Sequence, residues 1–197
     1  MNYLRGFIAW IAFSIAATLD WRLGAVTALI TGAALLVKER LDGSLAGSLI
    51  LEYSSVAFFA ALTALALARP HSWLGAHTGA VSSLWLALTA WATLAIGRPF
   101  TEEIAKRQTS PRVWNHPLFR RANVVITAAW ATAFTLSAAA MTVVYATGLG
   151  SVASAVIHLA GFLVPAVFTN RYRARMRRYA VQAGLLGPAE GNAAVSG

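Results

Sequence analysis

Residues 123–169 read NVVITAAWATAFTLSAAAMTVVYATGLGSVASAVIHLAGFLVPAVFT and contain no Asp, Glu, Lys or Arg. A hydrocarbon core about 30 Å thick needs about 20 mostly apolar residues in helical form. The stretch therefore predicts two membrane-crossing helices, 123–145 and 151–169, joined by a turn at 146–150. We expect this hairpin to belong to a helical bundle in a membrane.

The composition of the whole chain agrees with that expectation. Of its 197 residues, 58% are hydrophobic and only 12% are charged, whereas about 25% are charged in an ordinary soluble domain. The absence of cysteine excludes a disulfide-rich module and any thiol chemistry. The predicted fold is all-α, a polytopic transmembrane bundle that forms one domain over 1–179, with spans at about 4–19, 23–37, 49–68, 77–97, 123–145 and 151–169. The first segment is short, so five spans plus a re-entrant first segment are the alternative.

The basic residues are distributed unevenly along the chain. The sequence has 16 Lys and Arg against 7 Asp and Glu, a net charge of +9. If all six segments cross, every basic residue except Arg22 and Arg69 falls on one side. Basic loops stay in the cytoplasm, so we expect both termini to be cytoplasmic. If the first segment is re-entrant, only Arg5 changes to the other side of the membrane. The net charge then reflects topology, and no nucleic-acid partner is expected.

The longest polar stretch is RPFTEEIAKRQTSPRVWNHPLFRR at 98–121, within a predicted amphipathic cytoplasmic loop at 98–122. Thr101 can cap a short helix that Pro111 ends, with Phe100 and Ile104 facing the acyl chains. Two interpretations remain for the arginines of this loop. They form a phosphate-binding site for a lipid headgroup or a partner, or they are topology charges and interface anchors. The residues concerned are Arg98, Arg112, Arg120 and Arg121.

The same region carries a family resemblance. The order is Arg98-Pro99-Phe100, then Pro111 and Val113-Trp114, then Asn123 leading into a span with Trp130 and Phe134. This pattern resembles the intracellular septation protein A family of bacterial inner-membrane proteins, although residues 115–122 here separate the Trp from the Asn more widely. The resemblance implies a multi-pass protein of the bacterial cytoplasmic membrane, associated with envelope synthesis and septation. It implies no catalytic residues.

His158 is the only histidine deep in a predicted span, and Glu52 also falls within one; burial of an ionisable group there is costly unless the group is paired. His158 shares a helical face with the small residues Ser154 and Gly161 and with Pro165. It is either a proton carrier or ligand contact beside a proline kink, or a neutral imidazole that hydrogen-bonds between helices. Glu52 lies near the cytoplasmic edge of its span, where we expect it to pair with an arginine. No histidine spacing matches a metal motif, so neither a metal nor a cofactor is expected.

The sixth span is followed by RYRARMRRY at 171–179, a predicted basic juxtamembrane helix at 170–179. As a helix, it aligns Arg171, Arg175 and Arg178 on one face. Arginines at this position attract an anionic leaflet. The predicted anionic-lipid contacts are Arg171, Arg173, Arg175, Arg177 and Arg178. Residues 180–197 are expected to form a flexible tail.

Two functions remain compatible with these features. The first is a non-enzymatic protein that acts in envelope assembly or septation through helix and lipid contacts. The second is a small transporter or lipid-handling enzyme with a cavity near His158 and the Arg98–Arg121 loop. The expected partners are anionic membrane lipids, envelope or division proteins, and a second copy of the chain, for which the GxxxG patterns at 43–47 and 75–79 are weak indications.

Overall fold

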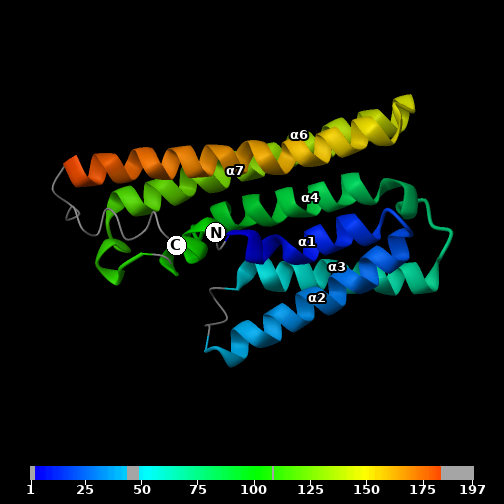
Figure 1. Ribbon diagram of the computed structural model, residues 1–197, viewed down its shortest axis with the longest axis horizontal. Coiled ribbons are helices and arrows are strands. Elements are labelled where there is room, and N and C mark those ends of the chain that lie inside the picture. The colour runs from blue at the N-terminus through cyan, green and yellow to red at the C-terminus, as the bar shows by residue number, and fades with distance from the viewer. Residues whose placement is uncertain (1–2, 44–48, 108, 183–197) are drawn as a thin grey trace. The chain divides into compact units, whose positions relative to one another are not determined.

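The computed structural model describes residues 3–43, 49–107 and 109–182, and all its regular structure in these ranges is helical. The predicted all-α class is confirmed. The predicted tail lies mostly outside the described residues. The elements are α1 (Tyr3–Ala16), α2 (Trp21–Leu41), α3 (Ile50–Ala68), α4 (Leu74–Ala95), α5 (Phe100–Lys106), the 3-10 turn η2 (Pro111–Val113), α6 (Pro117–Thr147) and α7 (Gly150–Gln182) (Figure 1).

Five helices in the described part of the chain are long and apolar enough to cross a membrane, namely α2, α3, α4, α6 and α7. Helix α1 is apolar but has only 14 residues, or about 21 Å of helix. These helices indicate a multi-pass helical membrane protein. The contacts divide the chain into two compact units, residues 1–85 and 86–197, which are described separately below.

In the first unit, α1, α2 and α3 pack together. The turn between α1 and α2 is fixed by Asp20, whose carboxylate accepts the backbone N–H of Arg22 at 2.7 Å and caps α2. Gly24 faces Ala17 so closely that a Cβ at position 24 would lie 2.8 Å from the Ala17 methyl carbon. The missing side chain therefore permits the tight α1–α2 turn.

An aromatic cluster joins α1 to α3. The rings of Trp10 and Phe59 are 4.6 Å apart, and those of Trp10 and Phe58 are 5.1 Å apart. The indole N–H of Trp10 donates to the buried Ser55 hydroxyl at 2.8 Å, which in turn donates to the Leu51 carbonyl. The ring contacts and the indole hydrogen bond of Trp10 therefore make α1 part of the first unit although it has only 14 residues.

The second unit is built on a long hairpin of α6 and α7, which lie side by side (Figure 1). Gly148 ends α6 in the left-handed conformation, with φ of +68°, which favours glycine. Both helices extend beyond their predicted spans, because α6 begins at Pro117 and α7 continues to Gln182. At the centre, buried Trp130 of α6 donates its indole N–H to Thr169 of α7 at 3.0 Å.

Candidate functional site

Helix α5 is held against α6 by a buried threonine pair. The Thr101 hydroxyl donates to the Asn123 carbonyl at 3.0 Å and is 2.7 Å from the Thr127 hydroxyl, and both threonine side chains are fully buried. The expectation that Thr101 caps the helix was wrong, because Pro99 occupies the N-cap position and the helix begins at Phe100. The threonine side chain instead bonds the neighbouring helix.

The apolar face of α5 is also buried in protein. Phe100 and Ile104 are 3% and 8% exposed, so the expectation that they face acyl chains was wrong. An amphipathic helix of this length has the same pattern whether its apolar face covers lipid or another helix. Here it covers α6, and the Phe100 N–H also reaches the Thr93 hydroxyl at 3.4 Å.

The outer face of α5 carries a small ion-pair group. Lys106 lies 2.9 Å from a carboxylate oxygen of Glu102 and 2.9 Å from one of Glu103. Partial burial lowers the pKa of Lys106, but its hydrogen bonds to Glu103 and Glu102 outweigh burial, so the net shift is upward. These carboxylates are therefore engaged by a lysine on their own helix.

The four arginines predicted for this loop are all exposed. Arg120 lies close to the start of the loop, because its guanidinium would be 3.5 Å from a Cβ atom placed on Gly97. Arg120, at the start of α6, therefore lies beside the turn that precedes Arg98. Arg112 is in η2, where its backbone N–H faces the Ser110 hydroxyl, and Arg121 follows on α6.

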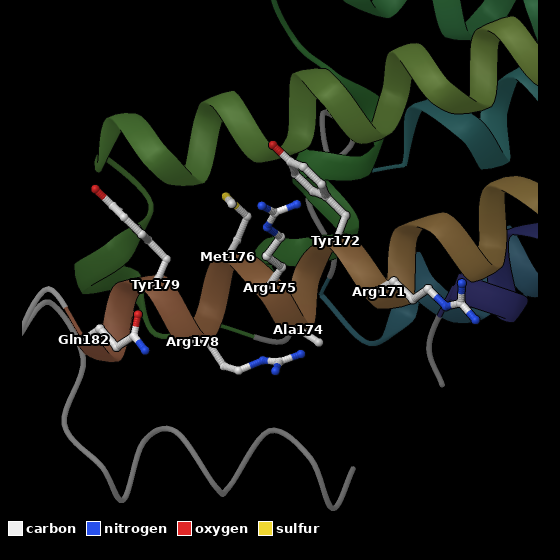
Figure 2. A pocket seen from close by; sticks show the side chains of 8 residues that line it. All are labelled: Arg171, Tyr172, Ala174, Arg175, Met176, Arg178, Tyr179 and Gln182. Carbon is white, nitrogen blue, oxygen red and sulfur yellow. The ribbon is translucent and has the colours of Figure 1, made fainter.

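The C-terminal third of α7 carries two adjoining grooves. One, of about 780 Å³, is drawn in Figure 2 and is lined by Arg171, Tyr172, Ala174, Arg175, Met176, Arg178, Tyr179 and Gln182. The other, of about 360 Å³, is lined by Val164, Val167, Phe168, Arg171, Tyr172 and Arg175. The two grooves share Arg171, Tyr172 and Arg175. A basic, tyrosine-bearing surface therefore continues directly into an apolar one.

The five predicted lipid-contact arginines fall into two groups. Arg171, Arg175 and Arg178 are exposed and line the grooves, whereas Arg173 and Arg177 are half-buried, line neither groove, and have other interactions in the chain. Figure 2 shows Arg175 on the same side of α7 as Tyr172 and Tyr179, while Arg178 points to the opposite side. Helical spacing predicts Arg171, Arg175 and Arg178 on one face and Tyr172, Met176 and Tyr179 on another, whereas all six residues line the larger groove.

His158 is exposed on α7, and its Nδ1 lies 3.0 Å from the Ser154 carbonyl of the same helix. Neither groove includes it. Its neighbours on the predicted stripe behave differently, because Gly161 lies against Ser137 of α6 and Pro165 is buried. Gly161 therefore packs against α6, and the histidine lies outside that contact.

Glu52 is half-buried in the first turn of α3, where the positive end of the helix dipole favours a carboxylate. It has an interaction within the chain, and pairing with an arginine stays a prediction. In the described part of the chain, no group of three His, Asp or Glu side chains could hold a metal ion.

Comparison of the chain with family models, with curated proteins and with solved structures gives no match. Sequence reasoning missed the Thr101–Thr127 pair and the Trp130–Thr169 bond, because the sequence alone does not show which threonine side chains are buried, and Thr101 was assigned to a helix cap. It also missed the apolar groove at Val164, Val167 and Phe168, because apolar residues are expected throughout a span and these three do not stand out.

Proposed function

We propose that this chain is a multi-pass protein of the bacterial cytoplasmic membrane that acts in envelope assembly or septation through helix and lipid contacts. The observation that carries the proposal is the construction of α7. Its apolar part passes directly into five arginines within eight residues, and no acidic residue occurs anywhere in the helix. Such an end suits a contact with anionic lipids at the cytoplasmic leaflet.

The distribution of basic residues supports a topology with the C-terminus and the loop between α4 and α6 in the cytoplasm. This topology places α5, η2 and the basic end of α7 on the same side of the membrane. Helix α1 crosses in a locally thinned bilayer or is re-entrant, since its roughly 21 Å fall short of a core about 30 Å thick. Either path leaves the other helices in the same orientation.

The role in the envelope is supported by the resemblance to the septation protein A family. That resemblance rests on residues 98–134, the segment that forms α5, η2 and the first half of α6. The structure gives this segment a defined surface, since α5 is docked on α6 and its arginines are exposed. A surface of this kind can present a fixed set of charges to a partner protein or to headgroups.

The experiment combines deletion with cross-linking in the bacterium that encodes the chain. We expect the deletion to change cell shape or septum placement, and cross-linking from native membranes to enrich division or envelope-synthesis proteins. A matched control is the deletion strain complemented with the wild-type chain, which should restore both results. Normal shape on deletion together with no enrichment of such partners would refute the proposed role.

A further inference from the structure

We infer that the two adjoining grooves on α7 form one binding site for an anionic phospholipid, with its phosphate at Arg171 and Arg175 and one acyl chain along Val164, Val167 and Phe168. This inference names the lipid class and the site within the proposed function. It rests on the membrane placement of α7 and not on the role in septation. The position of the grooves along α7, their charge and the continuity of their surface each support it.

The position of the grooves along α7 matches the edge of a bilayer. The helix from Gly150 to Thr169 is about 30 Å long, which equals the thickness of a typical hydrocarbon core. Arg171 then lies about 3 Å and Arg175 about 9 Å beyond that core, within reach of a headgroup layer about 5–8 Å deep. Arg178 lies about 14 Å out, beyond that layer, so it contributes less.

The charge of the site is uncompensated in the described part of the chain. Helix α7 has no acidic residue, and the structure there shows no ion pair or hydrogen bond from the side chains of Arg171 and Arg175. Guanidinium groups form strong, paired hydrogen bonds with phosphate oxygens. Exposed Tyr179 and half-buried Tyr172 line the same groove, and aromatic residues of this kind suit the interface.

The basic groove and the apolar groove form one continuous surface. The groove with Val164, Val167 and Phe168 shares Arg171, Tyr172 and Arg175 with the basic groove. Phe168 stacks on Tyr172, with ring centroids 5.4 Å apart and planes 17° apart. A ligand that fills both parts needs an anionic head and an apolar chain in one molecule. A soluble phosphate or an acidic peptide would leave the apolar part unfilled.

The decisive experiment compares two charge-matched double variants. Arg171→Gln/Arg175→Gln removes the groove pair, and Arg173→Gln/Arg177→Gln removes two arginines with the same spacing that line neither groove. Their mean depths differ by about 3 Å, much less than the screening length of about 8–10 Å, so general attraction to an anionic surface affects both variants alike. The full-length chains are purified in uncharged detergent and titrated with phosphatidylglycerol, and native mass spectrometry measures the first bound lipid.

We expect the groove variant to bind phosphatidylglycerol about tenfold more weakly than the wild-type chain, with the control pair changed less than threefold. Phosphatidylcholine should bind weakly to all three chains. An equal loss in both variants would overturn the site and leave only general attraction, and no loss in either would overturn the anionic contact altogether. Neither result depends on cell shape, so failure here and failure of the septation proposal are distinguishable.

A second arm tests the acyl chain. Phe168→Ala should weaken phosphatidylglycerol binding about fivefold, since the contact between the Phe168 ring and the acyl chain of the lipid is lost. The control, Leu159→Ala, changes an exposed residue of the same helix outside both grooves. Val167→Ala is a milder second probe if Phe168→Ala lowers the yield. Displacement of the lipid by equimolar glycerol 3-phosphate, or equal effects of Phe168→Ala and Leu159→Ala, would overturn the lipid as occupant.

Discussion

Replacing Thr101 with valine should release α5 from α6. The Thr101 hydroxyl bonds the Asn123 carbonyl and the Thr127 hydroxyl in a fully buried position. Valine keeps the shape of the side chain but removes the oxygen, so Thr127 loses a partner in a place that water does not reach. A buried polar group left without its partner costs about 1–3 kcal/mol.

We therefore expect α5 docking to weaken by about 2 kcal/mol, which raises the undocked population about 30-fold. Trypsin cleavage after Lys106 reports this population, because α5 must open before the protease can bind its last turn. When opening is fast relative to cleavage, the cleavage rate follows the population of the open form. The cleavage rate in Thr101→Val should therefore rise by about the same factor as the open population.

Two further variants complete the experiment. Thr142→Val removes an exposed hydroxyl that bonds only a carbonyl of its own helix at 2.9 Å, and it should leave the cleavage rate unchanged. Thr101→Val/Thr127→Val removes both hydroxyls, so the second change should cost much less than the first. Wild-type cleavage in Thr101→Val, or strictly additive costs in the double variant, would refute the structural reasoning.

Three other predictions concern topology, packing and pH. Cysteine at Leu149 should react with an impermeant thiol reagent added outside the cell and cysteine at Asp42 should not; equal labelling of both would contradict the proposed orientation. Gly161→Ala should destabilise the α6–α7 hairpin by about 1–3 kcal/mol, measured by unfolding in detergent, because the new methyl group collides with Ser137. Adding Ser137→Gly should restore the stability, and a double variant without that rescue would refute this contact. The pKa of Asp20 is lowered by its hydrogen bonds and charge contact with the neighbouring arginine, so its contribution to stability is present above the ordinary carboxyl pKa and disappears as the pH falls through the lowered value. Asp20→Asn should therefore reduce stability at neutral pH and have no effect at strongly acidic pH, and a pH-independent difference would contradict the assignment.

The hairpin could be predicted because membrane solvation acts on every residue of a span. Residues 123–169 lack charge, so their location followed from composition alone. The start of α6 at Pro117 was missed because helix formation does not stop where hydrophobicity stops. The signal was nevertheless present, since proline suits the first position of a helix and the His116 side chain accepts the Leu118 N–H at 3.2 Å.

The environment of α5 could not be predicted in the same way. A pattern of apolar residues tells which face avoids water, but it does not distinguish acyl chains from a neighbouring helix. Phe100 and Ile104 were assigned to lipid, and the structure buries them against α6. The same limit applies to α7, where spacing aligned three arginines but did not reveal that Tyr172 and Phe168 extend their groove toward the hydrocarbon.

The length of α7 has a mechanical consequence. The helix continues 13 residues past Thr169 to Gln182, which is about 20 Å of helix beyond the predicted end of the span. Transmembrane helices tilt by about 20° on average, and the tilt follows bilayer thickness. A tilt of that size would move the end of this segment sideways by about 7 Å, estimated from its 1.5 Å rise per residue. A change in local membrane thickness would thereby shift the Gln182 end of the helix sideways.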